Sequence, residues 1–211
     1  MTNSYKGLFI VFEGLDGSGQ TTQANLLRNF LEKKGFKVVL TKEPTLETKE
    51  GKEIKKVLEK KIKKSPLSLQ KLFAKDREKH LKKTIEPALR KGKTVISDRY
   101  LFSSLAYGSL DVSLKKLKEL NKNFLLPDLV FFLNVKADNC LKRIKKRGEK
   151  IHLFEEKEKL RKVYQNYQLI LKSFKNVYFI NGEKSKREVF REIKKIINQY
   201  LTKNKKLNII S

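Results

Sequence analysis

The stretch Gly14-Leu-Asp-Gly-Ser-Gly-Gln-Thr21 decides the fold of this chain. It follows the apolar run of residues 8–12 and leads into a segment whose apolar residues have helical spacing. In a phosphate-binding loop, a glycine-rich turn between a strand and a helix directs backbone N–H groups and the positive helix end toward an anion. An ordinary glycine-rich turn is the alternative. The strand before the turn and the amphipathic helix after it favour phosphate binding.

One residue of this stretch departs from the phosphate-loop pattern G-x-x-x-x-G-K-[ST]. Gly14, Gly19 and Thr21 match the two glycines and the hydroxyl, but Gln20 stands where the pattern has lysine. In such loops the hydroxyl binds Mg²⁺ and the lysine lies beside the outer phosphates. A charge-assisted hydrogen bond contributes about 1.5–3 kcal/mol and a neutral one about 1 kcal/mol. We therefore expect another cation to supply the charge that Gln20 lacks.

Five short apolar runs, rich in β-branched and aromatic residues, alternate with longer segments of helical periodicity. The runs are residues 8–13, 37–41, 94–98, 129–135 and 176–180. This alternation predicts an α/β fold in three layers, with a parallel sheet between two layers of helices. Two helical segments, residues 49–62 and 67–90, separate the second and third strands, and Pro87 should end or bend the second of them. Ser185 and Glu188 form a capping box that should begin the last helix.

The composition favours a single domain in a reducing compartment. A chain of 211 residues can bury the core of one α/β domain. Cys140 is the only cysteine, which excludes an intramolecular disulfide and fits a cytoplasmic protein. No apolar run is long enough to cross a membrane, and the N-terminus has no signal-peptide pattern. The net charge of +27 predicts attraction to nucleic acid, but the lysines are spread over polar helix faces, so we expect only non-specific binding.

Polar residues follow the predicted strands at their carboxyl ends, where open parallel sheets bind ligands. Lys42-Glu43-Pro44-Thr45 follows the second strand, and Asp98 and Arg99 end the third. A carboxylate there suits Mg²⁺ and a guanidinium suits phosphate, and a simple ion pair is the alternative. Phe73 and Arg77 lie one helical turn apart, so a ring and a guanidinium can meet a planar base together. The alternative places Phe73 in the core and Arg77 at its rim.

Arg143 and Arg147 are also one helical turn apart, at the end of the helix that follows the fourth strand. Gly148 comes directly after them, which predicts a hinged lid over residues 143–156. Phosphoryl transfer depends on positioning and on positive charge around the transferring group, and a basic lid would supply that charge. We therefore expect Arg143, Lys146 or Arg147 to replace the missing lysine. A solvated basic helix end is the alternative.

Several motifs, in order, resemble the thymidylate kinase family, P-loop enzymes that transfer the γ-phosphoryl of ATP to dTMP. They are residues 12–19, 41–44, 72–77, 98–107, 127–135 and 143–149. The family's fold is the doubly wound α/β layer predicted above. The resemblance implies an ATP:dTMP phosphotransferase that uses Mg²⁺ and forms a homodimer. Three positions depart from the family: Gln20, Lys42 in place of the usual arginine, and Thr45-Leu46 in place of a glycine pair.

The resemblance also implies roles for individual residues. ATP would contact Gly14, Leu15, Asp16, Gly17, Ser18, Gly19, Gln20, Thr21 and Thr22. The residues implied to contact dTMP are Asp16 at the sugar 3′-hydroxyl, Phe73 and Arg77 at the thymine, Arg99 at the phosphate, Ser104 at the base, and Tyr107 and Tyr167 around the deoxyribose. The residues implied to act in the transfer are Asp98, Arg99, Arg143, Arg147 and Gln20, with Thr21 and Asp98 at Mg²⁺.

Two other functions stay open at this point. Gln20 motivates a nucleotide-binding regulatory module with lost or weak catalysis, and the complete acceptor site speaks against that function. A kinase of another nucleoside monophosphate is the second alternative. A nucleoside kinase fits less well, because Arg99 and the basic lid suit an acceptor that already carries a phosphate.

Overall fold

The computed structural model of the chain describes residues 2–146, 148 and 157–204. Five parallel strands form one sheet in the order β2-β3-β1-β4-β5. The strands are β1 (Phe9–Gly14), β2 (Val38–Lys42), β3 (Thr94–Asp98), β4 (Leu129–Asn134) and β5 (Val177–Asn181). Each bound of every predicted strand lies within one residue of the observed bound, so the predicted parallel sheet is confirmed.

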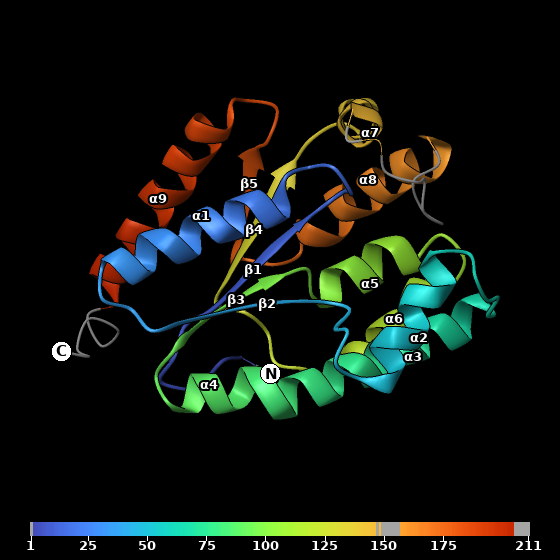
Figure 1. Cartoon of the computed structure of the whole chain (residues 1–211), viewed down its shortest axis with the longest axis horizontal. Helices are drawn as coiled ribbons and strands as arrows, with labels where there is room; N and C mark the ends of the chain where they lie inside the picture. Colours follow the sequence, from blue (N-terminus) through green and yellow to red (C-terminus); the bar gives the residue numbers. More distant parts are fainter. Residues whose placement is uncertain (1, 147, 149–156, 205–211) are drawn as a thin grey trace.

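Two groups of helices cover the two faces of this sheet (Figure 1). The helices are α1 (Gln20–Lys33), α2 (Lys49–Leu58), α3 (Pro66–His80), α4 (Glu86–Arg90), α5 (Leu101–Gly108), α6 (Leu114–Asn121), α7 (Ala137–Lys146), α8 (Lys157–Leu171) and α9 (Lys186–Lys203). α1 and α9 pack on one face, against Ile10 and Phe12. α5 and α8 pack on the opposite face, against Phe9 and Val11. Successive residues of β1 thus enter different cores, which is the predicted three-layer architecture.

The long helical segment between β2 and β3 adjusts its geometry before Pro87. α3 passes through the π-helical turn η1 (Leu81–Ile85) directly into α4. Proline has no N–H to donate to the preceding turn, and its ring crowds the carbonyl there. The wider π turn accommodates this interruption of the hydrogen-bond ladder. The predicted helix over 67–90 is confirmed, and Pro87 changes its local geometry without ending it.

The helix predicted over 49–62 is shorter than expected, because α2 ends at Leu58. Lys60 has a φ of 59°, in the left-handed region. The N–H groups of Lys60 and Lys61 donate hydrogen bonds of 2.9 and 2.8 Å back into the last turn, which is the Schellman pattern of a helix end. Gly35 ends α1 in the same way, with a φ of 87°. The sequence did not indicate this helix end, because a lysine occupies the position that usually holds glycine.

The strand register places the carboxyl ends of three strands side by side. Asp98, the last residue of β3, pairs with Phe12 of β1 and with Lys42 of β2. The phosphate loop follows β1 at this same edge, which is where the site was predicted.

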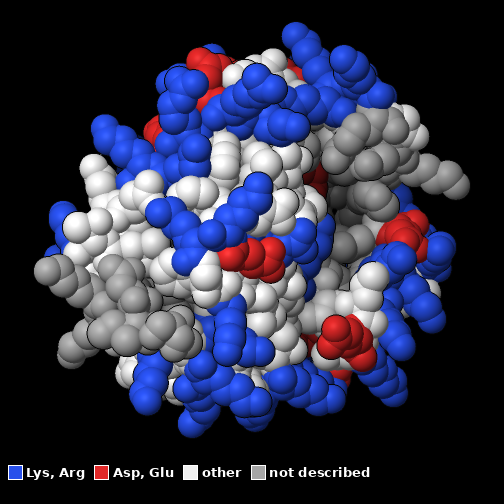
Figure 2. Space-filling view, turned by 60° about the vertical axis from the view of Figure 1, so that its left-hand side comes forward, with Lys and Arg blue, Asp and Glu red and all other residues white. Residues whose placement is uncertain are grey.

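The surface is strongly basic. Lysine and arginine side chains are spread over the face shown in Figure 2 and do not gather in a single stripe. This distribution agrees with the expectation of a solvated basic surface. Among the helices that the structure describes, none is long and apolar enough to cross a membrane.

Candidate active site

Two of the cavities at the carboxyl ends of β1, β2 and β3 meet beside the phosphate loop. The aromatic cavity has a volume of about 500 Å³, and its lining includes Phe73, Arg77, Tyr100, Ser104 and Tyr107. The loop cavity has a volume of about 850 Å³ and is lined by residues 16–23 together with basic side chains from α7 and from the start of α9. Asp16, Lys42 and Arg99 line both cavities, so the two spaces meet at these three side chains.

The phosphate loop has the backbone shape that its sequence predicts. Gly17 has a φ of 83° and Gly19 a φ of 102°, values that glycine adopts at little cost. A Cβ atom on Gly17 would lie 2.7 Å from the carbonyl oxygen of Cys140, so the close approach of α7 also requires glycine. α1 begins directly after Gly19, and the N–H groups of its first turn face the loop cavity. The loop therefore has the geometry of an anion-binding site.

The nine residues assigned to ATP divide into two groups. Asp16 through Thr22 line the loop cavity. Leu15 is buried in the hydrophobic core and does not line the loop cavity. The carbonyl oxygen of Gly14 accepts hydrogen bonds from Gln20 in the loop and from Arg99 after β3. Gly14 and Leu15 therefore support the loop without lining the loop cavity.

Gln20 is buried and hydrogen-bonded at both ends of its carboxamide. Its Nε2 donates to the carbonyl oxygen of Gly14 at 3.1 Å. Its Oε1 accepts a hydrogen bond from Nη2 of Arg99 at 3.3 Å. The residue that departs from the phosphate-loop pattern is thus connected to an arginine on the loop after β3.

Arg99 lies at the junction of the two cavities, and its side chain is 12% exposed. Its φ of 74° is in the left-handed region, where most residues are strained. Nη1 donates to Gly14 at 3.0 Å and to Ser103 at 3.1 Å, and Nη2 donates to Asp16 at 2.8 Å. The guanidinium also lies 5.3 Å from the centre of the Tyr107 ring. These contacts fix a positive charge between the two cavities.

Asp16 is held by the same group of residues. Tyr107 donates its hydroxyl to Oδ2 of Asp16 at 2.9 Å, and Arg99 binds Oδ1. Burial acts to raise the pKa of Asp16, but Arg99 and Tyr107 outweigh it and hold the pKa below its usual value. Asp16 is therefore an ionised hydrogen-bond acceptor at neutral pH.

Arg77 is one of the most deeply buried side chains of the protein, at 1% exposure. Nε donates to Glu43 at 2.8 Å, Nη1 to Asn121 at 2.5 Å and Nη2 to Ser104 at 3.0 Å. Phe73 is partly buried and lines the same aromatic cavity. The alternative that placed Arg77 at the rim of the core is wrong, because the ion pair with Glu43 makes deep burial of the guanidinium tolerable.

Glu43 and Asn121 were not identified as site residues from the sequence. Glu43 also accepts a hydrogen bond from Nδ1 of His80 at 3.1 Å, and Nε2 of His80 lies 2.6 Å from the hydroxyl of Thr41. The position of Glu43 in the polar cluster after the second strand did indicate that it lies near the site. Asn121 lies at the end of α6, in a segment without any motif, and no sequence signal marked it.

Glu13 is a second buried carboxylate that the sequence did not mark. Oε1 accepts backbone hydrogen bonds from Tyr100 at 2.9 Å and Ser103 at 3.2 Å. Oε2 accepts from the hydroxyls of Ser103 at 2.6 Å and Tyr167 at 2.8 Å. Burial is the main effect on Glu13 and raises its pKa to about 7, although the hydrogen bonds from the Ser103 hydroxyl, the Tyr167 hydroxyl and the Tyr100 backbone, together with the nearby Arg99, oppose the increase.

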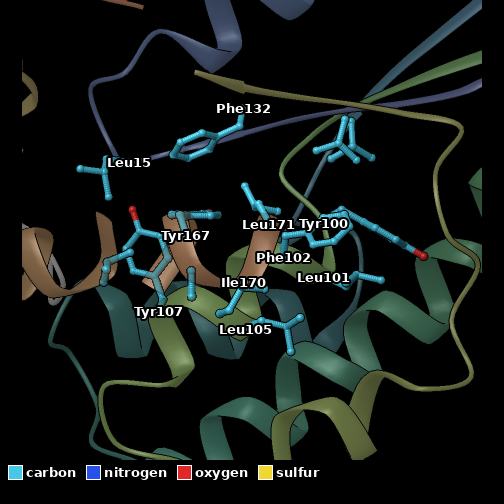
Figure 3. Close-up of a cluster of buried hydrophobic side chains, with 14 of the residues drawn as sticks. Leu15, Tyr100, Leu101, Phe102, Leu105, Tyr107, Phe132, Tyr167, Ile170 and Leu171 are labelled. Carbon is cyan, nitrogen blue, oxygen red and sulfur yellow. The ribbon is translucent and has the colours of Figure 1, made fainter. Parts of the chain in front are cut away.

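Tyr167 does not line either cavity. Its side chain is fully buried and lies between the rings of Tyr107 and Phe132, with centroid separations of 6.2 and 5.1 Å (Figure 3). The family resemblance implies that Tyr167 contacts dTMP. In the structure it supports Tyr107 from behind and bonds to Glu13, because α8 packs against α5 on this face of the sheet.

Thr21 and Asp98 come together as predicted. The hydroxyl of Thr21 donates to Oδ2 of Asp98 at 2.5 Å, and Nζ of Lys42 lies 3.4 Å from the same oxygen. A hydroxyl and a carboxylate beside a phosphate loop are oxygen ligands of the kind that Mg²⁺ uses together with nucleotide phosphates. No group of three or more His, Cys, Asp or Glu ligands exists among the described residues.

The basic residues predicted for the lid are only partly described. Arg143 donates to the carbonyl oxygens of Ser18 at 3.3 Å and Gly182 at 2.9 Å, so it joins the phosphate loop to the turn after β5. Lys146 lines the loop cavity. Arg147 and residues 149–156, most of the predicted lid, lie outside the described residues.

Comparisons with known proteins show the family to which the chain belongs. A family model described as thymidylate kinase matches residues 12–193. The probable thymidylate kinase of Pyrococcus abyssi is 41% identical over 202 residues, which cover 93% of this chain and 98% of the relative. That of Thermococcus gammatolerans is 39% identical, covering 92% of this chain and 97% of the relative. The thymidylate kinase of Caldicellulosiruptor saccharolyticus is 37% identical, covering 94% and 99%. The chain belongs to the thymidylate kinase family.

Proposed function

We propose that this chain transfers the γ-phosphoryl group of ATP to dTMP and produces dTDP and ADP. The observation that carries this proposal is the junction of the two cavities at Arg99. Two nucleotides bound in these cavities would present their phosphates to one fixed guanidinium. Membership of the thymidylate kinase family supports the assignment of both nucleotides.

The aromatic cavity suits a pyrimidine nucleoside monophosphate. Phe73 offers a ring for stacking, and Ser104 and Arg77 offer polar groups at the edge of the base. Asp16 is an ionised acceptor for a sugar hydroxyl. Tyr107 packs beside it and would occupy the space of a 2′-hydroxyl. The phosphate of the acceptor would then lie beside Arg99.

The loop cavity suits a nucleoside triphosphate. Backbone N–H groups of the phosphate loop and the start of α1 would bind the phosphate oxygens. Thr21 and Asp98 would hold Mg²⁺, which neutralises phosphate charge when it is bound. Arg143 fixes the position of the loop through Ser18 and adds a positive charge beside it.

The protein groups act in this proposal by positioning and by charge. Arg99 and Lys42 line both cavities and would stabilise the charge that develops on the transferring group. The acceptor phosphate oxygen attacks the γ-phosphorus, the bond from the γ-phosphorus to the bridging oxygen of ATP breaks, and ADP leaves. No covalent bond to the protein forms at any stage.

A substrate panel tests the assignment of the acceptor. ADP release from Mg-ATP is measured with dTMP, dUMP, dCMP, dGMP and the unphosphorylated nucleoside thymidine. We expect dTMP to give the highest kcat/KM and thymidine to give almost none, because Arg99 requires an acceptor phosphate. A higher kcat/KM with another nucleotide would reject dTMP as the substrate. Turnover of thymidine at a similar rate would reject the role of Arg99.

Three expectations from the sequence remain proposals. The protein forms a homodimer, which light scattering after size exclusion tests directly. Turnover requires a divalent cation. Removing metal with EDTA and then titrating Mg²⁺ tests this requirement.

Binding to nucleic acid is electrostatic and non-specific, so it should be lost at physiological ionic strength. Retention of DNA under those conditions would show a specific nucleic-acid site.

A further inference from the structure

We propose that the carboxamide of Gln70 binds the polar edge of the acceptor base and makes the aromatic cavity selective for thymine or uracil over cytosine. This inference rests on the proposed function and adds a residue that determines which pyrimidine binds. Gln70 belongs to none of the motifs that mark the site in the sequence, and it has no part in the contacts described above.

The first argument is the state of this side chain. Gln70 lies on α3, lines the aromatic cavity and is 5% exposed. Its Oε1 is buried and accepts no hydrogen bond from any residue that the structure describes. A buried polar atom without a partner is destabilising, and such atoms are uncommon in native proteins. A ligand in the cavity that Gln70 lines would supply the missing donor.

The second argument is the space that Gly108 leaves for the carboxamide. A Cβ atom on Gly108 would lie 2.9 Å from Cδ and 3.0 Å from Oε1 of Gln70. A larger residue at position 108 would therefore push the carboxamide out of its place against α5. The last torsion of a glutamine side chain is broad, so the carboxamide can turn in this space and present both Oε1 and Nε2 to a ligand.

The third argument is the order of groups along α3 and α5, which pack against each other. Gln70, Phe73 and Arg77 follow one another at spacings of three and four residues, so they share one face of α3. Arg77 donates to Ser104 of α5 at 3.0 Å. Gln70 lies against Gly108, which is one helical turn, or about 5.4 Å, further along α5. This separation is comparable with the polar edge of a pyrimidine, so a base stacked on Phe73 would meet Arg77 at one end and Gln70 at the other.

The fourth argument is chemical complementarity. Thymine and uracil carry an N3–H donor next to the O2 acceptor, and a carboxamide carries an acceptor next to a donor. Oε1 of Gln70 would accept from N3–H while Nε2 donates to O2. Cytosine has acceptors at both N3 and O2, so it would leave Oε1 facing another acceptor. A site built around such hydrogen bonds rejects a ligand that lacks them, because its buried polar groups are then left unpaired.

The test compares the affinities of the wild type and Gln70→Met for dTMP, dUMP and dCMP. Methionine has a similar length but no polar end. Calorimetric titration in the absence of ATP measures dTMP and dUMP binding, and competition with dTMP measures dCMP binding. We expect Gln70→Met to weaken dTMP and dUMP binding about tenfold each, since two neutral hydrogen bonds are lost, and to change dCMP binding less than about twofold.

The pattern of losses separates base recognition from a merely structural effect, which acts on every acceptor alike. Equal losses for dTMP and dCMP would overturn the proposal, and so would an unchanged affinity for dTMP. Gln165→Met is the matched control, because Gln165 is exposed on α8 and lines neither cavity. Its three affinities should equal those of the wild type. Thermal unfolding confirms that both variants are folded.

A second measurement needs no variant and decides the matter if Gln70→Met does not fold. In the wild type bound to dTMP, nuclear magnetic resonance should show the N3 imino proton protected from exchange with water. The same proton should show a nuclear Overhauser effect to the carboxamide protons of Gln70. An imino proton that exchanges as fast as in free dTMP, or that shows this effect only to other residues, would overturn the proposal.

These binding measurements keep the inference apart from the proposed function, because neither needs turnover. If dTMP binds through Gln70 and no dTDP forms, the inference stands and only the proposed function fails. If dTDP forms but Gln70→Met weakens dTMP and dCMP binding equally, the proposed function stands and only the inference fails.

Discussion

Replacing Glu13 with glutamine should stabilise the protein at alkaline pH. Oε1 of Glu13 accepts hydrogen bonds from two backbone N–H groups, and Oε2 contacts the hydroxyls of Ser103 and Tyr167. A hydroxyl can reverse and accept a hydrogen bond, so a protonated carboxyl or a carboxamide can donate from the Oε2 position. The two hydroxyls can therefore satisfy a neutral side chain at position 13.

The magnitude follows from the pKa of Glu13, which burial raises from 4.5 to about 7. Between these values the folded protein holds a proton that the unfolded chain has released. The contribution of Glu13 to stability is therefore fully present below pH 4.5 and is lost as the pH rises through 7. At about 1.4 kcal/mol for each pH unit, the loss amounts to roughly 3 kcal/mol. Glutamine does not titrate, so the variant avoids this loss.

The assay is urea denaturation of the wild type and Glu13→Gln between pH 5 and pH 8.5. We expect the stability difference to shift in favour of Glu13→Gln by about 2.5 kcal/mol over this range, because part of the loss has already occurred at pH 5. The matched control is Glu119→Gln, an exposed position at 57% exposure, whose difference from the wild type should not follow this trend. A difference between wild type and Glu13→Gln that does not change with pH would refute the reasoning.

Three further predictions concern single side chains. Arg77→Met should lower the free energy of unfolding by about 3–5 kcal/mol, because it leaves Glu43 buried without its guanidinium; a loss below 1 kcal/mol in urea denaturation would contradict this. Lys60→Gly should raise the free energy of unfolding by about 0.5–1 kcal/mol, since glycine adopts the φ of 59° without strain. A lower free energy of unfolding in this variant would show that the backbone of Lys60 is not strained. Phe73→Ala should weaken dTMP binding by about 1–3 kcal/mol, as measured by calorimetry, and unchanged affinity would exclude stacking on this ring.

The strands and most of the helices could be predicted because their signals are local. Short apolar runs, helical periodicity, caps and breakers lie within a few residues of the element that they mark. The capping box of Ser185 and Glu188 is present as predicted. The end of α2 was missed because Lys60 adopts a conformation that glycine usually adopts. The π-helical turn η1 was not predicted, because a proline indicates that the helix before it is disturbed but not which helical geometry results.

The site could be predicted only as far as its residues belong to motifs. Thr21 and Asp98 were expected to meet, since both follow carboxyl ends of neighbouring strands. The partners Glu43, Ser104 and Asn121 are 27 to 44 residues away from Arg77 in the chain. The packing of α3 against α5 and α6 brings Ser104 and Asn121 to it. The contact between Gln20 and Arg99 joins residues 79 positions apart and likewise depends on how the chain folds. Hydrogen bonds of this kind depend on tertiary structure and leave no periodic trace in the sequence.

The most direct test of the account is the quantification of dTDP made by the purified full-length chain from dTMP and Mg-ATP. Chromatographic separation of the four nucleotides measures donor and acceptor products in the same sample. The account predicts one dTDP for each ADP, with no ADP above background when dTMP is omitted. Binding of both nucleotides without formation of dTDP would contradict it, because the chain would then hold two nucleotides at Arg99 and transfer nothing between them.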